Sequence, residues 1–203
     1  MQMESIAVAV IAFLLGSMPT AFLMGRALKG IDVRDASSGN SGAVNAGRQL
    51  GKAIGILVLL IDAGKGVVAL LIGMAVGVPE IVLYISAVLV VVGHNYSPFL
   101  GFRDGKGAAT VLGMSALMLW QITAISVVVG AVLIIITRRA VWTMAAVFIL
   151  LNTLTIATSQ SLGLIVLFLV LSLMIAATHF SRQRAELIPA LTAGDWRRIM
   201  STD

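Results

Sequence analysis

Apolar segments about as long as a membrane is thick recur along almost the whole chain. They span roughly residues 5–25, 53–78, 81–99, 108–119, 122–137, 141–157 and 162–180. Charged residues make up only 11% of the 203 residues, whereas hydrophobic residues make up 59%. A membrane-spanning helix needs about 20 apolar residues, and soluble domains carry about twice this share of charge. The pattern therefore predicts an all-α, polytopic integral membrane protein.

The first apolar segment is interpreted as a transmembrane helix and not as a signal peptide. Glu4 is its only charge before the apolar stretch, and the first basic residues, Arg26 and Lys29, follow that stretch. A signal peptide begins with a basic region and ends at a small-residue cleavage site. Because basic residues mark the cytoplasmic side of a membrane, this order places the N-terminus outside.

The stretch 108–137 is expected to form two short helices that meet at Trp120-Gln121. Lys106 and the pair Arg138-Arg139 flank the stretch. An even number of crossings puts these basic residues on one side, as the positive-inside rule prefers. The result is a single membrane-embedded domain over residues 1–203 with seven transmembrane helices, the N-terminus outside and the C-terminus in the cytoplasm.

This topology collects the basic residues on one side of the membrane. Lys65 is the one basic residue within a predicted span. The inside loops and tail hold all the others, namely Arg26, Lys29, Arg34, Arg48, Lys52, Arg103, Lys106, Arg138, Arg139, Arg182, Arg184, Arg197 and Arg198. The net charge of +5 is therefore assigned to the positive-inside rule, and no nucleic-acid partner is predicted.

The residue inventory excludes several kinds of chemistry. The chain has no cysteine, which rules out disulfides, thiolate metal sites and cysteine nucleophiles. Its two histidines are too few for a histidine-built metal site, and no cluster of carboxylates suits a divalent cation. We therefore predict no metal.

The polar loop at 34–52 reads RDASSGNSGAVNAGRQLGK. Its small residues would let backbone N–H groups approach an anion, while serine and asparagine side chains add hydrogen-bond donors. Arg48 can grip phosphate oxygens with two parallel hydrogen bonds. A flexible loop is the alternative, but the density of serine and asparagine between basic residues favours an anion site.

A second loop, FRDGKGAAT at 102–110, leads into an apolar helix. Glycines before a helix expose N–H groups to a phosphate, and Lys106 adds positive charge. The loop is not a Walker A motif, because glycine follows the lysine and the required spacing is absent. A nucleotide hydrolase is therefore not supported.

Ionisable residues also lie within or beside the spans. Asp62 and Lys65 are three residues apart, so they share a helix face and can pair. Such residues inside a span are usually functional, although an ordinary salt bridge near the interface is an equal alternative. His94 and His179 lie at the inside ends of their helices, and either could carry a proton or simply be an interface histidine. The sequence does not decide which one is functional.

Together and in order, these motifs resemble those of the bacterial acyl-phosphate-dependent glycerol-3-phosphate acyltransferases, the PlsY family. The resemblance covers nearly the whole chain. The matching segments are Gly16-Ser17-Met18-Pro19, Ser38 to Gly51, Asp62 with Lys65-Gly66, Gly93-His94, and Gly105-Lys106-Gly107 with Ala109-Thr110.

The resemblance implies an enzyme of the bacterial cell membrane with its active face toward the cytoplasm. Such enzymes transfer a fatty acyl group from acyl phosphate to the 1-hydroxyl of glycerol 3-phosphate, giving lysophosphatidic acid and phosphate for phospholipid biosynthesis. They use neither coenzyme A nor a metal, so no cofactor is expected. The implied partners are the two substrates and membrane lipid, and we expect a monomer.

The candidate site follows from the matched motifs. By resemblance, Ser38, Arg48 and Lys106 would hold phosphates, and Asn45 and His94 would shape the pocket. The predicted catalytic residues are Ser38, Arg48, Lys106 and His94. The predicted substrate-binding residues are Gly39, Asn40, Gly42, Asn45, Asp62, Lys65, Gly105, Gly107, Thr110 and His179.

The chain departs from the family pattern at several positions. Val44 replaces a threonine, Asp104 replaces a glycine, and Gln183 or Arg184 stands where the family has a histidine. The run 140–143 also lacks the usual serines. Two alternatives therefore stay open: a paralogue that acylates a different acceptor, and a non-catalytic binder or carrier of a phosphate-bearing lipid.

Overall fold

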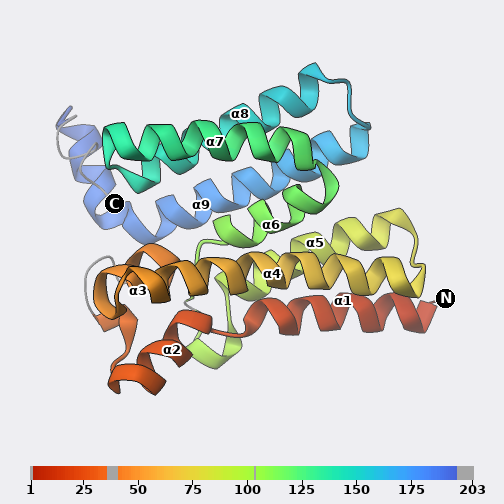
Figure 1. Ribbon diagram of the computed structural model, residues 1–203, viewed down its shortest axis with the longest axis horizontal. Coiled ribbons are helices and arrows are strands. Elements are labelled where there is room, and N and C mark those ends of the chain that lie inside the picture. The colour runs from red at the N-terminus through yellow and green to blue at the C-terminus, as the bar shows by residue number, and fades with distance from the viewer. Residues whose placement is uncertain (1, 36–40, 103, 196–203) are drawn as a thin grey trace. The chain divides into compact units, whose positions relative to one another are not determined.

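The computed structural model describes residues 2–35, 41–102 and 104–195 (Figure 1). Every regular element in these ranges is a helix. The chain divides into two compact units, residues 1–118 and 119–203, and each unit has its own set of packed helices.

The first unit is built around three long helices that pack side by side, with shorter helices against them (Figure 1). The long helices are α1 (Gln2–Ser17), α4 (Lys52–Val76) and α5 (Glu80–Asn95). The shorter elements are α2 (Thr20–Lys29), the 3-10 turn η1 (Val33–Asp35), α3 (Ala43–Leu50), the 3-10 turn η2 (Pro98–Leu100) and α6 (Ala108–Met118). Both α3 and α6 pack against α4.

Close contact between α1 and α5 depends on glycine. A Cβ atom on Gly16 would lie 2.0 Å from the carbonyl oxygen of Val90, and one on Gly93 would lie 2.2 Å from the carbonyl oxygen of Phe13. Small residues allow this close approach, and van der Waals packing then stabilises the helix pair. Inside a membrane this packing matters because no hydrophobic driving force acts between helices. These two glycines therefore fix the spacing between α1 and α5, and His94 lies in the last turn of α5.

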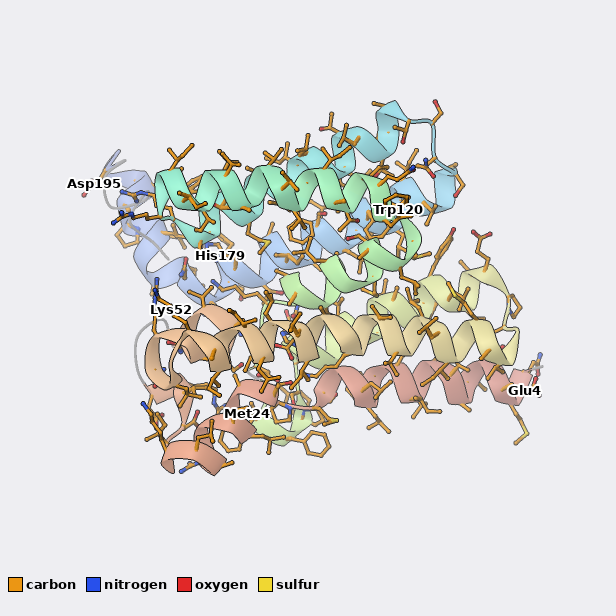
Figure 2. All side chains as sticks on the ribbon, viewed as in Figure 1. Glu4, Met24, Lys52, Trp120, His179 and Asp195 are labelled. Carbon is orange, nitrogen blue, oxygen red and sulfur yellow. The ribbon has the colours of Figure 1, made fainter. Side chains whose placement is uncertain are left out.

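The two ends of the first unit differ in charge. Figure 2 shows Glu4 near one end of this unit and Lys52, the first residue of α4, near the other. Lys29 reaches the Lys52 end as well, because its Nζ atom donates to the carbonyl oxygen of Gln49 at 2.6 Å, just before α4 begins. This end carries the polar loops of the candidate site.

The second unit consists of three helices that follow one another along the chain. They are α7 (Trp120–Thr137), α8 (Ala140–Ala157) and α9 (Leu162–Thr192). α8 packs against both α7 and α9. Between α8 and α9, the Asn152 side-chain amide donates to the Ser172 hydroxyl at 2.7 Å. This polar pair suits an apolar surrounding, where an unpaired amide would be costly.

The described helices confirm the prediction of an all-helical membrane fold. Six segments are long and apolar enough to cross a bilayer, namely Gln2–Lys29, Lys52–Val76, Glu80–Leu100, Trp120–Thr137, Ala140–Ala157 and Leu162–Ala185. The break expected within 108–137 is present at Leu119, between α6 and α7. At 11 residues α6 is shorter than a membrane span. The seventh span, which would require α6, stays a prediction.

Some helix boundaries differ from those expected from the sequence. The first segment breaks at Met18-Pro19, since proline has no N–H to donate to the preceding turn. The predicted polar loop 26–52 contains α3 and η1. The last helix continues to Thr192, beyond the expected end at residue 180, and its extension buries Leu187 and Ala190.

Candidate active site

The break between α1 and α2 leaves backbone carbonyl groups that need donors. The Ser97 hydroxyl donates to the carbonyl oxygen of Ser17 at 2.6 Å, and the Lys65 Nζ atom donates to that of Met18 at 2.5 Å. Without water, unsatisfied backbone groups are expensive inside a membrane. The Gly-Ser-x-Pro motif therefore forms a helix break, and its carbonyl groups accept hydrogen bonds from Lys65 of α4 and from Ser97, which precedes η2.

Asp62 and Lys65 form the ion pair that their spacing predicts. The Lys65 Nζ atom lies 2.7 Å from Asp62 Oδ1, and both residues are buried, with 6% and 2% of their surface exposed for lysine and aspartate respectively. The Thr20 hydroxyl donates to the same Asp62 oxygen at 2.8 Å. Each charged group thus has protein partners, and the predicted contact of these residues with substrate stays a prediction.

His94 connects this ion pair to the second glycine-rich loop. Its Nδ1 atom lies 4.0 Å from Asp62 Oδ1, and its side chain is buried. The Gly105 N–H donates to the carbonyl oxygen of His94 at 3.1 Å. A Cβ atom on Gly105 would lie only 1.8 Å from His94 Nε2. The loop therefore rests directly on the imidazole ring, which leaves room only for glycine.

Lys106 follows Gly105 and is half-buried at the start of the turn into α6. Gly107 has a φ of +80°, a left-handed conformation that favours glycine, and α6 begins at the next residue. Thr110 is fully buried on α6, where its backbone meets Gly66 of α4. The Gly-Lys-Gly segment thus places a cation before the N-terminus of a helix, and the binding of an anion there stays a prediction.

The end of the first loop lies against the second loop. The Ser41 hydroxyl donates to Asp104 Oδ1, and both side chains are buried. Asp104 is one of the positions at which this chain departs from the motif described above. Ser38, Gly39 and Asn40 lie outside the described residues. The two loops predicted to bind phosphate are therefore joined at Ser41 and Asp104.

We expect Ser41→Ala to destabilise the protein more than Ser86→Ala. The first change removes a buried hydrogen bond to a carboxylate between two loops, worth about 1–3 kcal/mol. Ser86 donates only to the carbonyl oxygen of Val82 in its own helix, where loss of the hydroxyl costs little. Thermal unfolding in detergent measures both, and equal losses would contradict the assigned link.

The helix α3 carries two of the candidate residues, Asn45 and Arg48. Gly42 precedes the first residue of α3 in extended conformation. Asn45 is buried, and its side-chain amide donates to the carbonyl oxygen of Val33 at 2.7 Å. Arg48 and Val44 are both exposed on the same short helix. Asn45 therefore orients the helix, while Arg48 keeps part of its surface accessible.

Sequence reasoning missed a second ion pair, between Asp32 and Arg34. The guanidinium Nη2 atom lies 2.7 Å from Asp32 Oδ2, and Nη1 donates to the carbonyl oxygen of Leu100 at 3.1 Å. The guanidinium also lies over the Phe22 ring, 5.5 Å from its centroid. The signal was the acid-x-arginine spacing, which allows a bidentate contact across a tight turn. Arg34 thereby fastens η1 to η2, next to both glycine-rich loops.

This pair has an electrostatic consequence. The hydrogen bond from Arg34 lowers the pKa of Asp32, although partial burial acts in the opposite direction. The same hydrogen bond raises the pKa of Arg34. Because the carboxyl pKa is lower in the folded state, the pair stabilises the fold above the unfolded pKa of Asp32 and loses that effect as the pH falls through the folded pKa.

The described candidate residues do not all belong to one unit. Gly42, Asn45, Arg48, Asp62, Lys65, His94, Gly105, Lys106, Gly107 and Thr110 lie in the first unit. His179 lies on α9 in the second unit, toward the end of this unit that carries Asp195 (Figure 2). The first unit alone therefore brings together the ion pair of α4, His94 and the Gly-Lys-Gly loop.

The helical fold defines an integral membrane protein. Its candidate site combines a buried ion pair with a basic, glycine-rich loop that packs against His94. The sequence model of the family described as "Glycerol-3-phosphate acyltransferase" matches residues 6–187. The chain belongs to the glycerol-3-phosphate acyltransferase family.

Individual relatives agree with this assignment. Glycerol-3-phosphate acyltransferase 2 of Moorella thermoacetica is 49% identical over 104 residues, 51% of this chain and 53% of that protein. A glycerol-3-phosphate acyltransferase of a Synechococcus species is 33% identical over 98% of this chain and 97% of its own. The chain thus aligns with about half of the first relative and almost all of the second.

A solved structure shows the same fold. The crystal structure of PlsY, an integral membrane glycerol 3-phosphate acyltransferase, in its glycerol 3-phosphate form is 30% identical to this chain. It superposes with a TM-score of 0.82 over 94% of this chain and 92% of the other. The lysophosphatidic acid form of PlsY gives a TM-score of 0.80 at 28% identity, with the same coverage.

Proposed function

We propose that this protein is an acyl-phosphate-dependent glycerol-3-phosphate acyltransferase of phospholipid biosynthesis. The observation that carries the proposal is the family match over residues 6–187, which includes the first-unit motifs around Lys106. The reaction transfers a fatty acyl group from acyl phosphate to the 1-hydroxyl of glycerol 3-phosphate. Its products are lysophosphatidic acid and inorganic phosphate.

In this proposal the two joined loops hold the phosphate groups. Lys106 and the backbone N–H groups near Gly105 and Gly107 bind one phosphate ahead of α6, where a helix N-terminus favours negative charge. Arg48 binds phosphate from the accessible surface of α3, together with Ser38 of the same loop. The link between Ser41 and Asp104 supports this division, because it joins the loop of Arg48 to the loop of Lys106.

The chemistry requires little more than these contacts. The substrate hydroxyl oxygen attacks the acyl carbonyl carbon, and an ester bond forms. The bond between that carbon and the phosphate oxygen breaks, and phosphate leaves with the electron pair. The hydroxyl proton passes to a phosphate oxygen of the substrate. Lys106 and Arg48 stabilise the negative charge of the departing phosphate, and their fixed positions align the hydroxyl.

The remaining candidates have secondary places in the proposal. Backbone groups of Gly39 and Gly42, with the side chain of Asn40, would add donors to the first loop. His179 is kept as a candidate from α9. The protein is proposed to act as a monomer on substrates that reach it from lipid and from the cytoplasm.

The donor preference tests this function directly. Purified protein in lipid is given labelled glycerol 3-phosphate with either palmitoyl phosphate or palmitoyl-coenzyme A. We expect labelled lysophosphatidic acid only from palmitoyl phosphate, since the proposed site recognises a small leaving phosphate. Equal or better turnover with the coenzyme A thioester would overturn the proposed donor.

The proposed topology places the loop end of the first unit in the cytoplasm of a bacterium. We expect a single cysteine in Lys52→Cys to react with a membrane-impermeant thiol reagent only after the cell is opened. Thr158→Cys, in the turn after α8, should react in intact cells. The absence of native cysteine makes both signals specific. The reverse pattern would invert the topology and move the active face outside.

A further inference from the structure

Four buried polar side chains link the break in the first transmembrane segment to the loop that carries Lys106. We call Thr20, Asp62, Lys65 and His94 the buried hub. Thr20 comes from the start of α2, Asp62 and Lys65 from the middle of α4, and His94 from the end of α5. Each has no more than 7% of its surface exposed. The hub thus joins three helices without presenting a broad surface to a substrate.

The contacts of the hub form a continuous series from the helix break at Met18 to the loop at Gly105. Lys65 binds the carbonyl oxygen of Met18 at 2.5 Å and Asp62 at 2.7 Å. Asp62 faces His94 at 4.0 Å. Beyond His94, the backbone of Gly105 lies so close to the ring that a Cβ atom would overlap Nε2 at 1.8 Å. The position of the ion pair therefore limits where the imidazole, and then the loop, can lie.

The same contacts argue against a direct grip on substrate by the ion pair. The Lys65 ammonium group already donates hydrogen bonds to two protein oxygen atoms. The Asp62 oxygen Oδ1 accepts hydrogen bonds from both Lys65 and Thr20. A phosphate bound here would have to displace these contacts and would approach the Asp62 carboxylate. By contrast, Lys106 lies in the loop itself and is only half-buried.

We propose that Asp62 and Lys65 are positioning residues, which act through His94 to set the conformation of the Gly105-Lys106-Gly107 loop. This inference rests on the proposed function only for its activity readout. Neither residue touches substrate in this proposal. Their charges matter because each neutralises the other in a buried place, where an unpaired charge is strongly unfavourable.

A double-mutant cycle separates positioning from direct binding. The variants are Asp62→Asn, Lys65→Gln and the two combined. Each single change leaves one buried charge without its partner, so we expect kcat to fall at least 10-fold, with KM for glycerol 3-phosphate within threefold of wild type. The combined variant has no charge on the α4 pair and two amides that can hydrogen-bond. It should recover at least fivefold over the worse single variant.

A stability control distinguishes this effect from general damage. Leu70→Ala removes a fully buried side chain from the same helix, five residues after Lys65, and the hub does not include it. We expect the folded fraction of this variant to keep the kcat of wild type, although its thermal stability falls. If Leu70→Ala lowers kcat of the folded fraction as much as Asp62→Asn does, the hub has no specific role.

The reaction rate of a single cysteine beside the loop measures the loop conformation without relying on catalysis. Ala108→Cys follows the loop directly, and Thr158→Cys in the second unit serves as the reference site. We expect Asp62→Asn to change the thiol reaction rate at residue 108 at least threefold and to leave the rate at residue 158 unchanged. If wild type shows no acyl transfer, the proposed function fails, but this shift still supports the positioning role.

Two results would overturn the proposal. The first is an unchanged reaction rate at residue 108 in Asp62→Asn. The second is a rise of 10-fold or more in KM for glycerol 3-phosphate in Lys65→Gln that the combined variant does not relieve. The latter result would mean that Lys65 binds the substrate phosphate directly.

Discussion

Replacing Lys106 by alanine should lower kcat/KM for acyl transfer about 10²–10³-fold, the usual effect of removing one group that stabilises transition-state charge. In the proposed mechanism the ammonium group neutralises the phosphate as it leaves. The half-buried Lys106 lies between two glycines ahead of α6, and the buried ion pair of the hub does not include it. The variant should therefore fold normally and lose turnover. The rate of phosphate release from palmitoyl phosphate measures this loss.

The matched control for this prediction is Lys52→Ala. Lys52 is an exposed lysine at the start of α4, and it lies outside the Gly-Lys-Gly loop. Its loss changes the net charge by the same amount, so a long-range electrostatic effect would appear in both variants. We expect the control to keep at least half of the wild-type rate. Normal turnover in Lys106→Ala would refute the assigned phosphate site.

Replacing Gly105 by alanine should abolish activity, and we expect at least a 100-fold loss. A Cβ atom would lie 1.8 Å from His94 Nε2, well inside van der Waals contact. His94 is buried beside Asp62, so the ring cannot move aside without disturbing the ion pair. The loop must shift instead, and displacement of a catalytic group by about 1 Å can cost about 100-fold in rate.

Gly64→Ala is the corresponding control. Gly64 lies in the middle of α4, and a Cβ atom added to it would meet no atom of another element within 4 Å. Alanine is favoured over glycine inside a helix by about 0.5–1 kcal/mol, so this variant should be as active as wild type and at least as stable. Equal activity of Gly105→Ala and Gly64→Ala would show that the loop does not rest on His94.

The sequence predicted the helical membrane fold well because the length and polarity of each segment are local properties. The break before Trp120 followed from the polar Trp120-Gln121 pair and from flanking charge. The break at Pro19 and the helix at 43–50 were not predicted. Contacts outside each segment complete both features: Lys65 pairs with the carbonyl oxygen of Met18 at the break, and Asn45 of the helix pairs with that of Val33.

The pairing of Asp62 with Lys65 could be predicted because it is also a local property: a spacing of three places both residues on one helix face. Their burial could not, because it depends on Thr20 and His94 from other helices. Spacing alone also could not show that Gly105 lies against an imidazole ring. From the sequence, Gly105 was interpreted as part of a phosphate-binding loop. The structure adds a steric reason for glycine at this position, because a Cβ atom would overlap the His94 ring.

The departures from the family pattern gain a partial explanation. Asp104 places a negative charge beside the loop predicted to bind phosphate, which is unfavourable on charge alone. In the structure this carboxylate accepts a hydrogen bond from Ser41, so it serves as a link between the two loops. The Val44 side chain is 53% exposed on α3, and nothing in the structure explains the loss of the threonine hydroxyl.

The measurement that tests the central claim most directly is the balance of products from purified protein in lipid. Palmitoyl phosphate and labelled glycerol 3-phosphate are supplied without coenzyme A, and labelled lysophosphatidic acid and phosphate are followed together. We predict that both appear in equal amounts. Phosphate without the labelled lipid would contradict the acceptor and favour a paralogue, and the absence of both from folded protein would contradict the enzyme assignment in favour of a phosphate-lipid binder.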